Sequence, residues 1–228
     1  IILMLVFIPK WDHQKDESLK DQIKQGSLAD VWKNKFFISV IPMGLFNYGG
    51  LMAIQTLWAG PWMIRVAGYT PLESATGLFW INITMLISYF IWGYILPKIS
   101  EYGLSSVKLI KLGLPISYFS LFLIIYFGNN SGAFLFTIYI VTSIVISLTQ
   151  PAIALNFPKN LAGKSLTSYN VFLFSGTFFI QWGIGLVIDF CSNKGFDVLS
   201  SYRISFSLFL ILCVLSYIFF VYLNRNEN

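Results

Sequence analysis

Charged residues are scarce in this sequence. Only 11% of its 228 residues are Asp, Glu, Lys or Arg, whereas a soluble domain carries about 25%. Hydrophobic residues make up 56% of the chain. This balance excludes an ordinary soluble domain and indicates a membrane protein. The net charge of +5 does not indicate nucleic-acid binding, because the basic residues are not clustered into a patch.

Residues that carry catalytic or metal chemistry are also few. The single histidine, His13, lies in a polar segment, and Cys191 and Cys213 are isolated along the chain. We therefore expect no metal site, no cofactor and no disulfide framework. No nucleophile is accompanied by a base, which argues against an intramembrane enzyme.

A polar segment separates a short apolar run from the rest of the chain. Residues 1–9 are too few to cross a bilayer and lack the basic start of a signal peptide, so we expect the end of a truncated transmembrane helix. Residues 10–35 are rich in lysine and acids and are expected to form a loop. Within them, the spacing of Ser27 and Asp30 predicts a capping box and a short amphipathic helix at the membrane surface. A plain solvated linker is the alternative for residues 10–26.

Six long apolar runs follow this segment. Each is close to or above the roughly 20 residues that a spanning helix requires. The sequence therefore predicts an all-α membrane protein with six transmembrane helices, and residues 158–164 are expected to be a loop between the fourth and the fifth. The runs are 36–62, 73–97, 106–128, 132–157, 165–190 and 203–223.

Lysine and arginine are distributed unequally between the two sides of this predicted bundle. If residues 10–35 lie inside, twelve of the fifteen basic residues fall on that side, and only Arg65, Lys194 and Arg203 fall outside. The positive-inside rule then places both termini, including the tail 224–228, in the cytoplasm. The richness in Phe, Ile, Lys and Asn is compatible with an AT-rich genome, so we expect a bacterial inner membrane.

The six runs repeat in character after three helices. Runs one and four carry polar and aromatic side chains, runs two and five carry small residues, and runs three and six are almost wholly apolar. Runs three and six are therefore expected on the lipid-facing outside. Equivalent runs start 92 to 97 residues apart. Because three crossings is an odd number, the second triplet inserts upside down, which gives the 3+3 inverted repeat of secondary transporters. A chance pattern is the alternative.

In this arrangement the chain resembles the C-terminal half, helices seven to twelve, of a major facilitator superfamily (MFS) transporter. The resemblance covers nearly the whole chain and is strongest at residues 48–62 and 181–189. It implies that residues 10–35 are the central cytoplasmic loop and that residues 36–223 are the six-helix C-terminal bundle.

The loop motif of that family is matched only loosely after the second run. Gly93, Lys98 and Gly103 fit the pattern, but Pro97 stands where the family has an acid, and Glu101 replaces a basic residue. This loop therefore does not predict the salt bridge that would gate a transporter of the family.

Uncharged polar residues inside the runs are candidates for a substrate cavity, since polar groups are costly in lipid unless they face protein or water. Offsets of four, eight and eleven from Tyr139 predict that Ser143, Ser147 and Gln150 share its helical face. Tyr48 and Gln55 likewise share a face of the first run. The alternative role is hydrogen bonding between helices, which we favour for Asn82 and Gln181. The cavity candidates are Asn47, Tyr48, Gln55, Asn82, Tyr139, Ser143, Ser147 and Gln150.

Small residues and the loop after the second run are candidates for gating or close helix packing. Gly49 and Gly50 either let the first helix bend or let it pack closely on a neighbour. The full set is Gly49, Gly50, Gly60, Pro61, Gly93, Lys98, Gly103, Gly176, Gly183 and Gly185.

These patterns favour a secondary active transporter that moves a small solute by alternating access. No ionisable residue lies in the middle of a run, which disfavours a highly charged solute unless the other half supplies the counter-charge, and places any proton relay in the N-terminal six-helix half, the expected partner. The other expected partners are the solute, a coupling proton or ion, and the lipid bilayer. A non-transporting scaffold or receptor on the same fold is the alternative function, as is an intramembrane enzyme.

Overall fold

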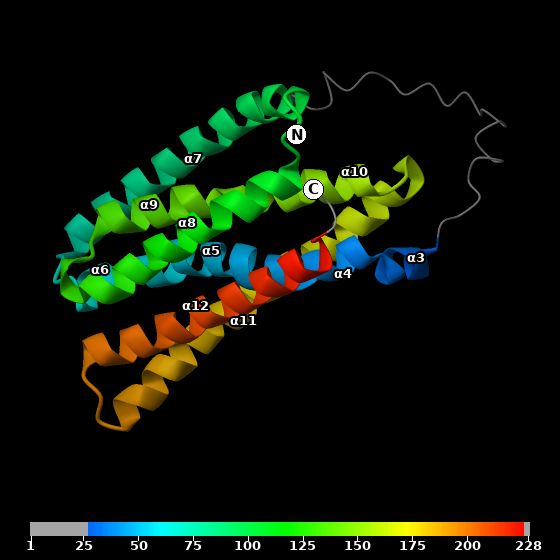
Figure 1. Cartoon of the computed structure of the whole chain (residues 1–228). Helices are drawn as coiled ribbons and strands as arrows, with labels where there is room; N and C mark the ends of the chain where they lie inside the picture. Colours follow the sequence, from blue (N-terminus) through cyan, green and yellow to red (C-terminus); the bar gives the residue numbers. More distant parts are fainter. Residues whose placement is uncertain (1–26, 226–228) are drawn as a thin grey trace, which may run out of the picture.

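Residues 27–225 are described by a computed structural model, and every regular element in that range is a helix (Figure 1). Six of these helices are long and apolar enough to cross a membrane. The prediction of an all-α chain with six helices of spanning length is confirmed, and they indicate an integral membrane protein. The truncated helix and most of the loop predicted for residues 1–35 lie outside the described residues, as do residues 226–228. We number the spans 1 to 6: Lys35–Arg65, Pro71–Ile99, Ser106–Asn130, Ala133–Asn156, Lys159–Asn193 and Val198–Leu223.

Spans 1 and 4 are each divided into several helical segments. Span 1 consists of α4 (Lys35–Met43), the π-helical η1 (Gly44–Tyr48), α5 (Gly49–Ala53), the π-helical η2 (Ile54–Trp58) and α6 (Ala59–Arg65). Span 4 consists of α9 (Ala133–Ser143), the 3₁₀-helical η4 (Ile144–Leu148) and α10 (Thr149–Asn156).

The other spans are single α-helices for most of their length. They are α7 (Pro71–Glu101), α8 (Ser106–Phe127), α11 (Lys159–Asn193) and α12 (Val198–Leu223). A 3₁₀ turn, η3 (Gly128–Asn130), completes span 3, and the short α3 (Leu28–Lys33) precedes span 1.

Local hydrogen bonds fix where several helices begin. The Ser27 hydroxyl accepts a hydrogen bond from the Ala29 N–H, and the Asp30 carboxylate accepts one from the Ser27 N–H, so the capping box predicted for α3 is present. Before α7, the Glu73 carboxylate accepts a hydrogen bond from the Thr70 N–H, and the Thr70 hydroxyl accepts one from the Glu73 N–H. These side chains satisfy backbone N–H groups that have no partner inside a helix.

Span 5 begins earlier than the sequence predicts. The expected loop at residues 158–164 is wrong for residues 159–164, because α11 begins at Lys159. Pro158 stands immediately before the helix, where a residue without an N–H leaves no donor unsatisfied. Leu161 is buried, so packing against the bundle also holds this first turn in place.

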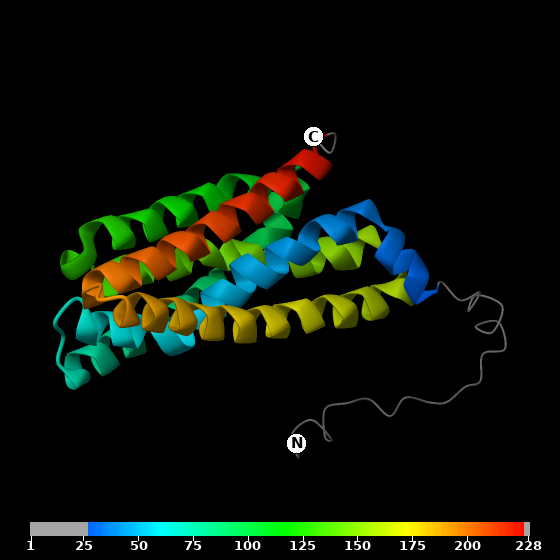
Figure 2. The ribbon, with the colours of Figure 1, turned by 90° about the horizontal axis from the view of Figure 1, so that it is seen from below.

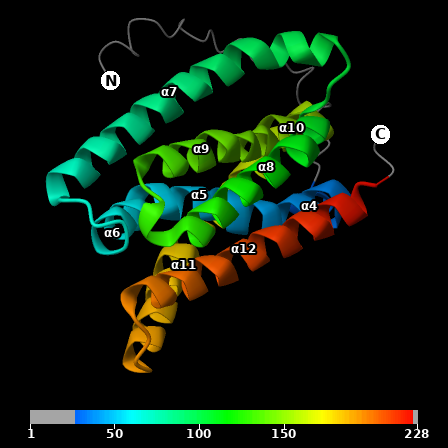
Figure 3. The ribbon, with the colours of Figure 1, turned by 60° about the vertical axis from the view of Figure 1, so that its left-hand side comes forward.

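Spans 1 and 4 form the centre of the bundle. α11 packs on span 1 at α5 and α12 packs on it at α4, while α7 and α8 pack on span 4 at α9. Figures 1 and 2 show α11 and α12 together beside the segments of span 1. α8 also contacts α12, which joins the two groups of helices. α7 lies along the outer edge beyond α9 (Figure 3).

Aromatic side chains fill the core near one end of the bundle. We call it the Arg65 end, because it holds the connections that follow Arg65, Asn130 and Asn193. Trp62 is fully buried there, with its ring centroid 4.7 Å from that of Phe206. Its indole N–H donates to the Ser131 hydroxyl at 2.9 Å. Trp62 therefore joins span 1 to span 6 and to the connection between spans 3 and 4 at this end.

Large apolar side chains are exposed on more spans than the sequence predicts. Exposure to lipid is expected for spans 3 and 6, yet Phe90 of α7 and Phe174 of α11 are 72% and 73% exposed. A hydrophobic surface of this kind needs lipid or a protein partner to cover it. Spans 2 and 5 thus also contribute to the outer surface of the isolated bundle.

Spans 1 and 5 cross with their backbones nearly in contact. A Cβ atom added to Gly49 would lie 2.5 Å from the carbonyl carbon of Gly176, and one added to Gly176 would overlap the backbone of Leu45. Glycine permits this approach because it has no side chain. The crossing sets which faces of span 1 remain open.

Replacing Gly176 with alanine is expected to destabilise the bundle by about 1–3 kcal/mol, because the added methyl group has no space against span 1. The measurement is the free energy of unfolding in detergent micelles. The matched control is Gly183→Ala in the same helix, where a Cβ meets nothing within 4 Å. Both changes gain the same helix propensity, so a Gly176→Ala variant as stable as the control would contradict the close crossing.

Candidate functional site

Both central spans depart from α-helical geometry near their middle. π-Helical turns close hydrogen bonds from i to i+5, and they are frequent at functional sites. A 3₁₀ helix advances about 120° per residue, against about 100° in an α-helix. The five residues of η4 therefore add a rotation of about 100°. Side chains beyond such a segment face a direction that a continuous α-helix would not give them.

Polar side chains of spans 1, 2 and 5 meet at the surface of the bundle. The Gln55 amide donates to the Asn82 side-chain oxygen, and the Gln181 amide donates to the Thr56 hydroxyl at 2.9 Å. Gln55 and Gln181 are half-buried, whereas Thr56 and Asn82 are exposed. We call these four residues the polar face. Tyr48, which precedes Gln55 on span 1 and is separated from it by α5, is half-buried as well.

A groove lined by aromatic residues lies next to the polar face. Its volume is about 360 Å³, and Gln181 lines it together with Leu57, Phe178, Trp182 and Asp189. Gln181 is thus shared between the groove and the polar face. The groove combines two ring surfaces, an amide and, toward the Arg65 end, a carboxylate, so it offers stacking and hydrogen bonding to a small solute.

Asn47 lies inside the bundle, away from the polar face. Its amide donates to the Ser216 hydroxyl at 2.9 Å, and its oxygen accepts a hydrogen bond from the Tyr118 hydroxyl at 2.8 Å. These bonds join spans 1, 3 and 6. Asn47 is only 6% exposed. The contacts are those of a residue that holds helices together, which is the alternative role that the sequence leaves open for polar residues.

The four candidates in span 4 fall into two environments. Tyr139 and Ser143 are buried and line an internal cavity of about 10 Å³ with Asn47. Ser147 and Gln150 are half-buried, and the Ser147 hydroxyl lies 3.2 Å from that of Tyr89 in span 2. The single face expected for these residues is divided because η4 rotates the chain between Ser143 and Gln150.

The glycine candidates also differ in their surroundings. A Cβ on Gly50 would overlap the ring of Phe209, so this position, like Gly49 and Gly176, is a close helix contact. Cβ atoms added to Gly60 and Gly185 would lie 3.3 Å from the nearest side-chain atom. Those added to Gly93, Gly103 and Gly183 would meet nothing within 4 Å. Pro61 lies within α6, and Lys98 donates to the Tyr94 hydroxyl at 2.7 Å.

Charged groups in the described residues lie toward the ends of the spans. Asp197, in the connection before α12, accepts a hydrogen bond from the Ser200 N–H at 3.3 Å, and hydrogen bonds from Ser200 lower the pKa of its carboxyl group. Within residues 27–225, no three His, Cys, Asp or Glu side chains gather as a metal site requires. The middle of the described bundle therefore offers neutral hydrogen-bonding groups to a ligand.

No protein family, curated protein or solved structure matches this chain. Several residues of the site are not sequence candidates: Thr56, which completes the polar face, and Leu57, Phe178, Trp182 and Asp189, which line the groove. The sequence favours contact between helices for Gln181, and its bond to Thr56 is such a contact, but at an open surface. The four-residue spacing of Phe178 and Trp182 is a signal that one helical face contains both.

The hydrogen bond between Asn47 and Tyr118 is expected to contribute to stability. A double-mutant cycle with Asn47→Leu and Tyr118→Phe should give a coupling energy of about 0.6–1.7 kcal/mol, the range found for interhelical bonds in membranes. The measurement is the free energy of unfolding in detergent. Gln150→Leu combined with Tyr118→Phe serves as a control that should be additive to within about 0.5 kcal/mol. If the destabilisations caused by Asn47→Leu and Tyr118→Phe were also additive, the hydrogen bond between these two residues would be excluded.

Proposed function

We propose that this chain is one six-helix half of a secondary active transporter, built like the C-terminal half of an MFS transporter, and that its polar face lines the path of a small uncharged solute. The observation that carries the proposal is the polar face itself. Thr56 lies about 13 Å along span 1 from Arg65, at a rise of about 1.5 Å per residue, which is a depth where lipid would surround an outward-facing side chain. Polar side chains at that depth face water or protein, since lipid offers them no hydrogen bonds.

The contacts between spans support an internal repeat. In the proposed repeat, spans 1, 2 and 3 are equivalent to spans 4, 5 and 6. Span 1 packs on span 5, and the equivalent contact, span 4 on span 2, is also present. Span 1 also contacts span 6, and the equivalent contact, span 4 with span 3, is present too. Spans 3 and 6 are equivalent to each other in this repeat, and they are in contact. An inverted repeat in a transporter would give this pattern.

The irregular segments support the same assignment. η1 and η2 interrupt span 1, and η4 interrupts span 4, the span equivalent to it in the proposed repeat. Interrupted helices that cross near the centre of the membrane are typical of substrate sites in secondary transporters. They also provide places where a helix bends as access changes from one side of the membrane to the other.

The proposed partner is a second six-helix bundle that covers the polar face. Exposed apolar residues on spans 2 and 5 flank that face, as Trp80 of α7 and Phe178 of α11 illustrate. A partner bundle would cover these residues at its margins and leave a central path for water and solute over the polar face. The neutral side chains of the face favour a solute that carries hydrogen-bonding groups and no net charge, and any coupling proton or ion would bind mainly in the partner.

Cysteine labelling in native membranes tests whether the polar face meets water. A membrane-impermeant maleimide is expected to label Thr56→Cys, because a thiol in a water-filled path can ionise and react. The control is Phe119→Cys, eight residues from the same end in α8 and 60% exposed, which is expected in lipid and unreactive. The unmodified chain measures the background from the buried Cys191 and Cys213. An unreactive Thr56→Cys, or equal labelling of both variants, would contradict the proposal.

A further inference from the structure

A second groove lies between α8 and α12. Its volume is about 530 Å³. Phe122 and Ile125 of α8 form one wall, and Ile204 and Leu208 of α12 form the other. The one charged residue that lines it, Arg203, lies toward the Arg65 end, one turn into α12. The groove thus has an apolar length and a cationic end.

Arg203 is bonded to protein without being neutralised by it. Its Nε donates to the Ile125 carbonyl oxygen at 2.9 Å, and one terminal nitrogen donates to the Tyr126 carbonyl oxygen at 2.8 Å. Both acceptors are uncharged, and they hold the guanidinium in a fixed position at the end of α8. Within residues 27–225, no carboxylate forms an ion pair with this side chain. Since a guanidinium has five N–H donors, several remain available to a ligand.

The surroundings of Arg203 are those of a membrane interface. Tyr126, whose carbonyl binds Arg203, is 65% exposed and lies in the last turn of α8. Tyrosine is enriched where the hydrocarbon meets the lipid headgroups. At this depth the apolar walls of the groove run into the hydrocarbon region, while the guanidinium remains at the level of phosphate groups.

We propose that this groove is a binding site for a glycerophospholipid of net negative charge. One acyl chain of the lipid lies along Phe122 and Leu208, and its phosphate accepts hydrogen bonds from the free N–H groups of Arg203. The charge favours an anionic lipid over a zwitterionic one, because the guanidinium has no acidic partner in the described chain and the headgroup supplies the missing negative charge. This site does not depend on the proposed transport function.

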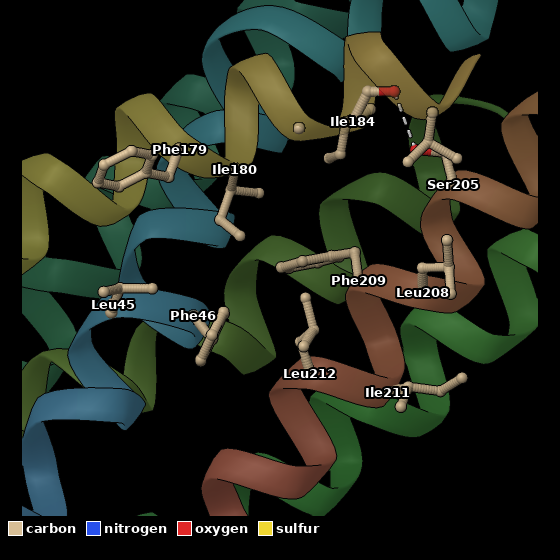
Figure 4. A pocket seen from close by; sticks show the side chains of 12 residues that line it. Leu45, Phe46, Phe179, Ile180, Ile184, Ser205, Leu208, Phe209, Ile211 and Leu212 are labelled. Atoms are coloured by element: carbon tan, nitrogen blue, oxygen red, sulfur yellow. Dashed lines mark hydrogen bonds between the residues drawn. The ribbon is translucent and has the colours of Figure 1, made fainter. Parts of the chain in front are cut away.

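A neighbouring groove provides a control within the same molecule. It lies between span 1, α11 and α12, has a volume of about 520 Å³ and is lined almost entirely by apolar side chains (Figure 4). Its one hydroxyl, that of Ser205, donates to the Ile184 carbonyl at 3.0 Å. No charged residue lines this groove, so an acyl chain would enter it with no preference for a headgroup.

The test uses the purified chain in phosphatidylcholine vesicles that contain a trace of spin-labelled phosphatidylglycerol or spin-labelled phosphatidylcholine. The immobilised fraction of each lipid is measured by electron spin resonance. We expect about fivefold stronger association of phosphatidylglycerol, the effect of about one basic residue near the membrane surface. Arg203→Gln is expected to abolish this preference. Ser207→Trp, which fills the groove but keeps Arg203 and its carbonyl bonds, is expected to abolish it too, even if Arg203→Gln unfolds.

Two control variants distinguish the groove from a general effect of charge. Arg65→Gln removes the exposed arginine at the same end of the bundle, and Gly183→Trp fills the neighbouring apolar groove. Both are expected to keep the preference for phosphatidylglycerol. Equal association of the two lipids with the unmodified chain would overturn the proposal. So would a preference that survives in Ser207→Trp, or one that Arg65→Gln reduces as much as Arg203→Gln does.

Discussion

A polar group at the depth of the hydrocarbon core finds its hydrogen-bond partner in protein or in a water-filled path, because lipid offers none. The arrangement of this bundle depends on that constraint. Inside the bundle, Asn47 satisfies it through Tyr118 and Ser216, with both partners supplied by neighbouring spans. At the surface, the Thr56 hydroxyl accepts a hydrogen bond from Gln181 and donates one to the Met52 carbonyl oxygen, but the Thr56 side chain is exposed, where a further surface has to cover it. The same requirement thus stabilises the core and marks the open face as incomplete.

Which polar residue lies in the core and which at the surface is decided by the geometry of span 1. The near contact of Gly49 with Gly176 fixes the distance and the orientation of span 1 against α11. The π-helical segments on either side of this crossing then alter the direction in which residues point. Asn47 is buried, whereas Thr56, nine residues further along, is exposed. Nine residues complete two and a half turns of a regular α-helix, so these two side chains point in different directions even before the π turns change the angle between them.

The sequence was sufficient to predict the number and class of the helices, because long apolar runs have few other stable arrangements. The capping box at Ser27 and Asp30 was also predictable, since it depends on residues three apart in the chain. The environments of Tyr139 and Gln150 were not, because the 3₁₀ turn between them is set by tertiary packing and leaves no pattern in the hydrophobic periodicity. The pairing of Thr56 with Gln181 was equally out of reach, as it joins residues 125 positions apart.

The hydrogen bonds on the polar face also limit how it would recognise a solute in the proposed transporter. Gln55 is already bound to Asn82, and Gln181 to Thr56, so a solute has to replace these bonds or use the lone pairs and N–H groups that they leave free. Because an exchange of neutral hydrogen bonds gains only about 0.5–1.5 kcal/mol each, the four residues alone support weak binding. The aromatic surfaces of Phe178 and Trp182 add apolar contact on one side. In the proposed transporter, tight recognition would require groups from the partner bundle facing the same path, and weak binding by each half alone would suit a carrier that has to release its solute on the far side of the membrane.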